Sequence, residues 1–213
     1  VQAVLDSHPY DFCHIDVQHS PINEEAILCF CGIAQQFELP VKMRIKHARD
    51  AYLIGNYLDL GLSGIEIPSA ELESTVDEAT NALFYPPTGR RSWGEPHKGP
   101  GIPTDRVGHA KWYDNYGMLW LQMESIVGVT NARRLAKPGV DCFSFGPNDL
   151  NFDIETYPAH PLDSVDKCVK HVLEQLADST AAVCFRTTPE DRKKYADMGV
   201  TVFLEPPPDA HSL

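Results

Sequence analysis

The sequence predicts an α/β protein built on a (β/α)8 barrel. Short apolar runs recur along the chain, each is followed by a helical pattern, and no hairpin signal separates them. Most of these runs are apolar enough to be buried on both faces, as parallel strands are. The polar residues best suited to chemistry follow the strand ends, which favours a barrel over a doubly wound sheet.

Seven strands are predicted, at residues 12–17, 41–45, 64–68, 118–123, 140–145, 181–185 and 200–204. Helices are expected over about 21–37, 51–60, 70–83, 126–136, 163–176 and 189–198. Asn23 and Thr188 have the residue types that cap a helix start, and Gly61 and Gly199 have the type that follows a helix end. Because a closed barrel needs eight strands, its first strand is expected to lie upstream of this chain, or the barrel is closed differently. Residues 1–5 are expected to form the end of a helix.

Composition narrows the class of protein. The 213 residues, of which 43% are hydrophobic and 23% charged, are expected to form one domain over 1–213. A net charge of −12 argues against a nucleic-acid partner, and no apolar run approaches the roughly 20 residues that span a bilayer. No secretory leader is evident, and six cysteines without a CxxC pair indicate reduced thiols, so a cytoplasmic location is expected.

Residues 85–103 break the regular pattern, with five prolines and four glycines. Such a composition excludes regular secondary structure. A loop of this length inside a compact domain is either functional or disordered. It carries Arg90, Arg91 and Trp93.

Two acidic residues follow neighbouring predicted strands. Glu124 ends one strand, and Asp149 lies 25 residues further on, one βα unit away. Converging carboxylates repel one another unless a cation lies between them, and oxygen ligands select a hard ion such as Mg²⁺ or Mn²⁺. The alternative is structural: Glu124 pairs with Arg or Lys, and Asp149 caps a turn or helix.

Two further strand ends carry candidates for catalysis. His19 could be a general base, with Asp16 fixing its tautomer or acting through a metal-bound water; alternatively His19 only begins a helix. Arg44 and Lys42 share one face of their strand, and a guanidinium there would bind a substrate carboxylate in a bidentate manner. The alternative for Arg44 is an internal salt bridge to Asp16 or Glu66.

Several segments together resemble the HpcH/HpaI family of class II, metal-dependent pyruvate aldolases, which includes 2,4-dihydroxyhept-2-ene-1,7-dioate aldolase and macrophomate synthase. They occur in the family's order over almost the whole chain: FCHIDVQHSP (12–21), MRI (43–45), GIEIP (64–68), YPPTGRR (85–91), QME (122–124), PGVD (138–141) and GPNDL (146–150). The resemblance implies a (β/α)8 barrel, a homo-oligomer, and a C-terminal helix exchanged between subunits that this chain lacks.

The resemblance also implies roles for individual residues. Glu124 and Asp149 would ligate a divalent ion, Mg²⁺ first, with Mn²⁺ or Co²⁺ as alternatives. Arg44 would bind the keto acid and steady its enolate, while His19, with Asp16 beside it, would transfer protons. Gln122 would support the metal shell. The loop 146–149, which includes Gly146, Pro147 and Asn148, would bind the substrate carboxylate through backbone N–H groups.

The implied activity is a metal-dependent carbon–carbon lyase acting on a 4-hydroxy-2-oxo acid and an aldehyde through a pyruvate enolate. An oxaloacetate decarboxylase, a decarboxylating bond-forming enzyme like macrophomate synthase, and a catalytically silent binding barrel remain alternatives. The loop 85–103 would cap the site and help to form the aldehyde pocket. The chain departs from the family at Gln18, where many members have Glu, and at residues 204–208, where a Gly-Ser-Asp type of loop is expected.

Overall fold

The computed structural model describes residues 10–94, 97–99 and 101–206, and its core is a parallel sheet. Seven strands pair in sequence order, and all six pairings are parallel. Every predicted strand is present. The strands are β1 (Cys13–Asp16), β2 (Val41–Arg44), β3 (Gly64–Ile67), β4 (Met118–Met123), β5 (Cys142–Phe145), β6 (Ala182–Arg186) and β7 (Val202–Leu204).

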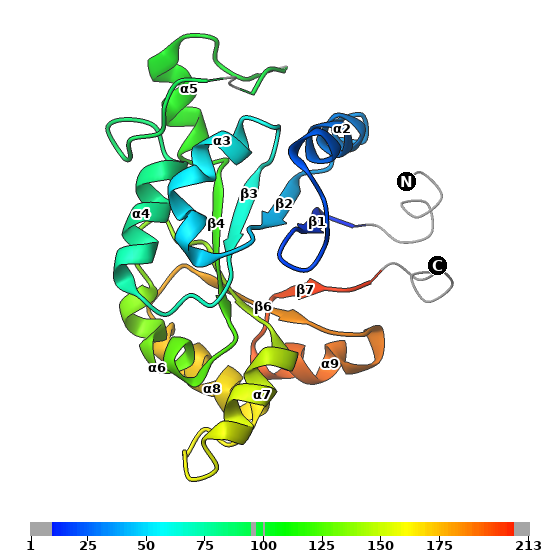
Figure 1. Ribbon diagram of the computed structural model, residues 1–213, viewed down its shortest axis with the longest axis vertical. Helices are drawn as coiled ribbons and strands as arrows, with labels where there is room; N and C mark the ends of the chain where they lie inside the picture. The colour runs from blue at the N-terminus through cyan, green and yellow to red at the C-terminus, as the bar shows by residue number, and fades with distance from the viewer. Residues whose placement is uncertain (1–9, 95–96, 100, 207–213) are drawn as a thin grey trace.

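The sheet curls without closing (Figure 1), which confirms the seven parallel strands expected of a barrel-like sheet, whereas the described residues do not form a closed eight-stranded barrel. Within the described residues, β1 and β7 are edge strands that do not pair with each other. The Tyr10 hydroxyl donates to the carbonyl oxygen of Pro206 at 3.5 Å, so the segments beside the two edges still meet. The fold is a seven-stranded half-barrel of the TIM type. The helix expected at residues 1–5 and the closing segment beyond Pro206 lie outside the described residues.

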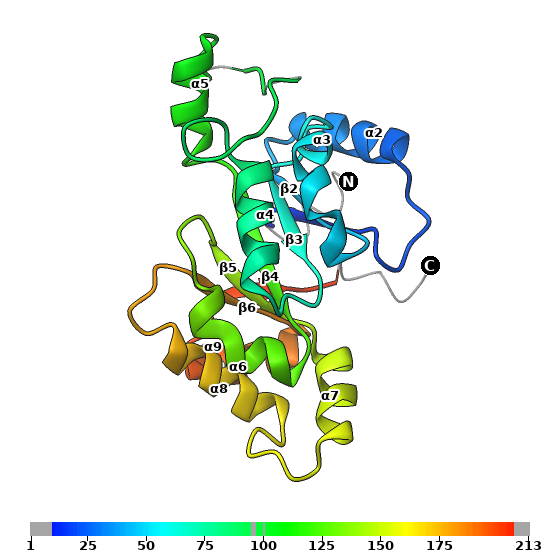
Figure 2. The ribbon, with the colours of Figure 1, turned by 60° about the vertical axis from the view of Figure 1, so that its left-hand side comes forward.

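Helices cover the convex face of this sheet (Figure 2). The described residues form α2 (Glu24–Gln35), the 3-10 helix η1 (Ala48–Leu53), α3 (Ile54–Leu58), α4 (Glu73–Leu83), α5 (Arg106–Tyr113), α6 (Ile126–Leu135), α7 (Pro147–Thr156), α8 (Val165–Gln175) and α9 (Pro189–Met198). Asn23 caps α2 through a hydrogen bond from the Ala26 amide, and Gly199 ends α9 in the left-handed conformation, as predicted. Two helices were not predicted, α5 and α7.

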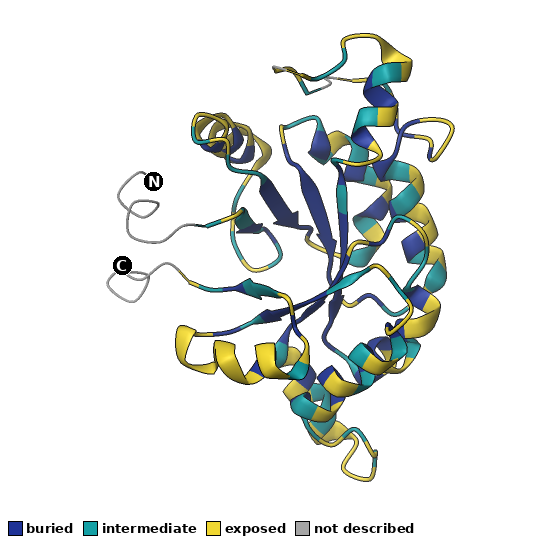
Figure 3. Cartoon of the chain, turned by 180° about the vertical axis from the view of Figure 1, so that it is seen from behind, coloured by how far each residue is buried: buried dark blue, intermediate teal, exposed yellow. Residues whose placement is uncertain are grey.

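Successive side chains of each strand point alternately to the helix-covered face and to the concave face of the sheet, and the two faces differ in polarity. Side chains such as Met43, Ile65, Leu121 and Phe143 face the helices and form the main hydrophobic core. The concave face holds a smaller apolar cluster of Trp120, Cys142, Cys184 and Leu204, and beyond it a set of charged residues. The central strands β2 to β5 are almost entirely buried, the edge strands β1 and β7 are mostly half-buried, and the outer helix surfaces are exposed (Figure 3). The polar site is therefore built on the concave side of the sheet.

The described part of the segment 85–103 lies at the amino end of the strands, not over the site as expected. It connects the end of α4 to α5, which precedes β4, and Figures 1 and 2 show α5 at the opposite end from α7. Trp93 packs against Tyr85 and His109 there, with ring centroids 5.3 and 5.4 Å apart. The prediction that Arg90 and Trp93 cap the active site is wrong, because the connection from a helix to the next strand must lie at the amino end of that strand.

Two other predictions can be compared with the described residues. All six cysteines are free thiols, as expected. In the part of the chain that the structure describes, no helix is both long enough and apolar enough to cross a membrane.

Candidate active site

A cavity of about 220 Å³ opens at the carboxyl ends of the strands. Its lining includes most of the residues that the sequence singled out, together with one that it did not: His19, Arg44, Gln122, Gly146, Pro147, Asn148, Asp149 and Arg186. These residues come from the ends of five strands, β1, β2, β4, β5 and β6, and from the loops and helix that follow them. The parallel arrangement brings them together because all strand carboxyl ends lie at one edge of the sheet.

Glu124 follows β4 and is 6% exposed. One carboxylate oxygen, Oε1, accepts hydrogen bonds from the Ser69 amide at 2.8 Å and the Ser69 hydroxyl at 2.6 Å. The other, Oε2, is buried without a hydrogen-bond partner among the described residues, and the Arg44 guanidinium is 4.0 Å away. Burial raises the pKa of Glu124, and the nearby negative charge of Asp149 adds to the increase. The carboxylate thus has one anchored oxygen and one free oxygen.

Asp149 lies in the first turn of α7, a helix that begins directly after β5. The segment 146–149 is therefore a helix start, not a loop as predicted. Pro147 occupies the first turn, and Gly146 precedes the helix without a side-chain cap, so the amides that follow are available to an anion. A Cβ at Gly146 would lie 2.5 Å from Gln122 Nε2 and 3.1 Å from Glu124 Oε2, so a side chain at this position would displace the Gln122 amide and crowd Glu124.

The residues present fit a divalent cation. Glu124 Oε2 is a buried oxygen without a hydrogen bond from the described residues, Asp149 supplies a second carboxylate, and Gly146 has no side chain to fill the space beside them. Oxygen donors of this type suit Mg²⁺ or Mn²⁺. Among the residues that are described, no group of three or more His, Cys, Asp or Glu side chains is arranged so that it could hold a metal ion by itself. Further ligands would come from substrate and water.

Arg44 is 5% exposed and lies between the acids of the site. Its Nε donates to Asp16 Oδ1 at 2.9 Å, its Nη2 pairs with Asp16 Oδ2, and its Nη1 donates to Gln122 Oε1 at 3.0 Å. The salt bridge to Asp16, the structural alternative for Arg44, is therefore present. Because Nη1 also faces Glu124 at 4.0 Å, the guanidinium still presents charge to the cavity.

His19 lines the cavity, but its expected relation to Asp16 is not supported. The Asp16 carboxylate bonds to Arg44 and accepts from the Gln18 amide at 3.0 Å. Burial opposes ionisation of Asp16, but the Arg44 hydrogen bonds and charge lower its pKa overall. Asp16 thus positions Arg44 rather than fixing the tautomer of His19.

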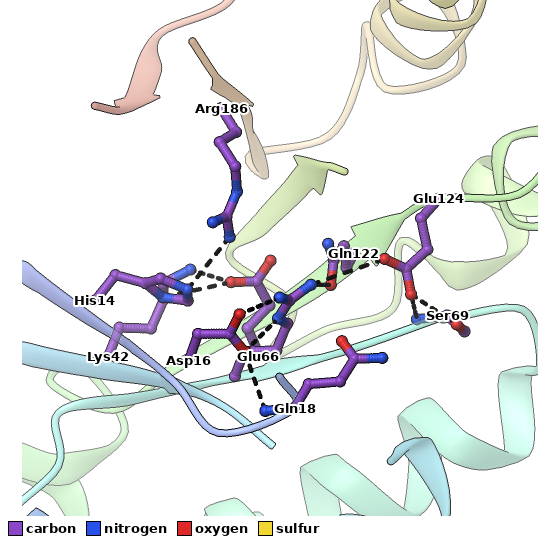
Figure 4. Close-up of polar contacts among 10 residues, drawn as sticks. His14, Asp16, Gln18, Lys42, Glu66, Ser69, Gln122, Glu124 and Arg186 are labelled. Atoms are coloured by element: carbon purple, nitrogen blue, oxygen red, sulfur yellow. Dashed lines mark hydrogen bonds and ion pairs between the residues drawn. The ribbon is translucent and has the colours of Figure 1, made fainter. Parts of the chain in front are cut away.

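Beneath the cavity, the concave face carries a charged cluster that the sequence analysis did not assign (Figure 4). Lys42 and Glu66 form a fully buried ion pair, and His14 Nδ1 lies 3.7 Å from Glu66 Oε2. Burial disfavours the ionised form of Glu66, yet Lys42 lowers its pKa to about 2. Arg186, at the end of β6, donates toward His14 Nε2 at 3.3 Å. The available signal was strand alternation, which places all four residues on the inner face.

The fold and this set of side chains define an α/β enzyme of the barrel type with its site at the strand carboxyl ends. Sequence comparison then gives the family. The chain belongs to the HpcH/HpaI aldolase/citrate lyase family, which it matches over residues 3–201. The resemblance inferred from the motifs is confirmed, and the protein is an aldolase/lyase of this family.

Individual relatives have aldolase names. The chain is 29% identical over 205 residues to a hydroxypyruvate/pyruvate aldolase of Chromohalobacter salexigens, covering 92% of this chain and 78% of that protein. It is 26% identical over 213 residues to a 4-hydroxy-2-oxovalerate aldolase of Rhodococcus jostii, covering 96% and 79%. The crystal structure of an HpcH/HpaI aldolase from Desulfitobacterium hafniense has the same fold, with a TM-score of 0.82 at 22% identity over 95% of this chain and 79% of that one.

Proposed function

We propose that the protein is a divalent-metal-dependent aldolase that makes or breaks a carbon–carbon bond of a 4-hydroxy-2-oxo acid through the enolate of pyruvate. The observation that carries this proposal is Glu124 Oε2, a buried oxygen that receives no hydrogen bond from the described residues and lies near the charge of Asp149. The names of the two relatives, one acting on hydroxypyruvate and pyruvate and the other on 4-hydroxy-2-oxovalerate, support the substrate class.

Glu124 and Asp149 would hold the cation, Mg²⁺ in the first instance and Mn²⁺ or Co²⁺ as alternatives. A bound divalent cation would supply Lewis acidity, which lowers the energy of a negative charge developing on the 2-oxo oxygen. Gln122 would hold Arg44 in place through the 3.0 Å hydrogen bond between them.

The remaining steps belong to the residues of the chain. The free amides at the start of α7, at Asn148 and Asp149, would bind the substrate carboxylate beside Gly146 and Pro147. Arg44 would place a fixed positive charge near the oxygen that becomes negative. His19 would remove the proton of the 4-hydroxyl group in cleavage and return it in addition. In the cytoplasm, where reduced thiols persist, the chain would act as a homo-oligomer.

The test compares Glu124→Gln with Glu73→Gln, a partly exposed residue of α4 that pairs with Arg134 and Lys137 away from the cavity. Two reactions are followed with added Mg²⁺ and with a chelator: exchange of the C3 protons of pyruvate for deuterium, and release of pyruvate from 4-hydroxy-2-oxopentanoate. We expect Glu124→Gln and the chelator each to slow both reactions by about 100-fold or more, while Glu73→Gln behaves like the wild type.

Exchange and cleavage that survive both treatments would contradict the proposal. Oxaloacetate is assayed in parallel, because its decarboxylation requires the same enolate. Decarboxylation without cleavage of any 4-hydroxy-2-oxo acid would replace the aldolase by a decarboxylase at the same site.

A further inference from the structure

Arg186 is a cation of the cavity without an acidic partner. Among the described residues, no Asp or Glu side chain forms an ion pair with it, and its one hydrogen-bonding contact is His14 Nε2 at 3.3 Å. It is half-buried and lines the same cavity as Arg44 and Asp149. The two other basic residues of the concave face are both neutralised, Arg44 by Asp16 and Lys42 by Glu66.

The side chain is held across the interior of the half-barrel. β6 and β1 are separated by four strands in the sheet, yet Arg186 reaches from one to the other (Figure 4). His14 can receive this contact because it is neutral: burial and the charge of Lys42 lower its pKa to about 3. An unprotonated Nε2 accepts from the guanidinium, which leaves the Nδ1 proton directed to Glu66, 3.7 Å away.

The position of Arg186 separates it from the groups that would bind the oxo acid. Glu124, Asp149 and the start of α7 follow β4 and β5, and Arg44 ends β2. Arg186 ends β6, and its guanidinium projects toward β1 while Glu124 turns toward Ser69 (Figure 4). The carboxylate and keto oxygens of the oxo acid would occupy the groups that follow β2, β4 and β5. An anionic group on the reacting aldehyde would then lie near Arg186.

We propose that Arg186 recognises a negatively charged group, a carboxylate in the first instance, on the aldehyde that reacts with the oxo acid, with His14 as its positioning residue. This inference rests on the proposed function. The guanidinium fork binds a carboxylate in a bidentate manner, and an unpaired cation inside a protein of net charge −12 is a local attractive centre for such a group.

The experiment measures kcat/KM for aldol addition of pyruvate, with Mg²⁺ present, to two pairs of aldehydes of matched length. The charged members are glyoxylate and 4-oxobutanoate, and the neutral members are acetaldehyde and butanal. A third pair, glyceraldehyde 3-phosphate and glyceraldehyde, tests phosphate as the source of the charge. We expect the wild type to prefer the charged carboxylate member by about 10-fold or more.

Three variants accompany this comparison. Arg186→Met should reduce the preference to about 2-fold or less, mainly through KM, and Arg186→Lys should restore part of it. His14→Leu should weaken the preference by about 3-fold without abolishing it, because it removes only the contact that orients the guanidinium. Arg192→Gln is the matched control, since Arg192 is an exposed cation of α9 that pairs with Glu205.

Two outcomes overturn the assignment. In the first, the wild type has the same kcat/KM for charged and neutral aldehydes. In the second, Arg186→Met lowers kcat/KM for charged and neutral aldehydes by the same factor. A preference for the phosphate pair alone would assign Arg186 to a phosphorylated aldehyde and overturn the carboxylate. Deuterium exchange into pyruvate alone provides the separate readout. Its absence in the wild type overturns the proposed function, whereas exchange without aldehyde preference overturns only the role of Arg186.

Discussion

Arg91 at the amino end of the sheet and Arg186 at the carboxyl end are used in opposite ways. At the amino end, Arg91 is 4% exposed, pairs with Asp59 at 2.6 Å, and lies 4.7 and 4.8 Å from the rings of Tyr85 and Tyr113. At the carboxyl end, Arg186 forms no ion pair with an acidic side chain of the described residues, and Glu124 retains an oxygen without a hydrogen bond among them. A charged side chain that is paired within the chain contributes to stability, whereas a charged side chain without an ion-pair partner is available to bind a ligand.

The largest effect is expected for a substitution of Arg91, and it concerns the free energy of unfolding. Replacing it by Met removes the partner of Asp59 and the cation between two aromatic rings, so the free energy of unfolding should fall by about 2–4 kcal/mol. Urea unfolding measures this change. Aldol cleavage per folded molecule should equal that of the wild type, because Arg91 lies outside the cavity at the strand carboxyl ends. If Arg91→Met is as stable as the wild type but inactive, then Arg91 serves the reaction and not the stability of the fold.

A pH series sharpens the comparison through His14 on the concave face and His97 at the amino end, two partly buried histidines with lowered pKa values. Burial and Lys42 lower the pKa of His14 to about 3, and burial and Arg91 lower that of His97 to about 4. In the unfolded chain both titrate near 6.5. Below this pH the unfolded state takes up protons that the folded state does not bind, so stability falls as the pH decreases.

Each histidine should contribute a slope of up to about 1.4 kcal/mol per pH unit between pH 6.5 and 4.5, above the range in which Glu66 and Asp16 titrate. His14→Gln and His97→Gln should each remove about half of the combined slope in urea unfolding. A slope that neither variant alters would show that these histidines are protonated in the folded protein.

The smallest effect is expected for Trp93, in the segment 85–103. Trp93→Ala should lower stability by about 1–3 kcal/mol through lost packing on Tyr85 and His109, and should leave the relative kcat/KM values of different aldehydes unaltered. Steady-state kinetics with the same aldehyde pairs provide the check. Altered aldehyde selectivity would place this segment at the active site after all.

Much of the site could be predicted because its residues end predicted strands. Glu124, Arg44 and His19 follow apolar runs, so parallel strands bring them to one edge whatever the details of packing. The segment 85–103 was placed at the wrong end although the chain order contained the answer, since it connects a helix to the next strand. The helix α7 was missed because Gly146 and Pro147 were interpreted as a loop, although proline is favoured in the first turn of a helix.

The sequence by itself determined the seven strands, the sorting of their side chains onto two faces, and the acids and arginine at their ends. These features depend on local periodicity, which a single segment contains in full. The tertiary structure decided that the half-barrel stays open within the described residues, that Arg44 binds Asp16, and that Arg186 of β6 meets His14 of β1. Such contacts join residues up to 172 positions apart, and they depend on the curvature of the sheet, which no local pattern specifies.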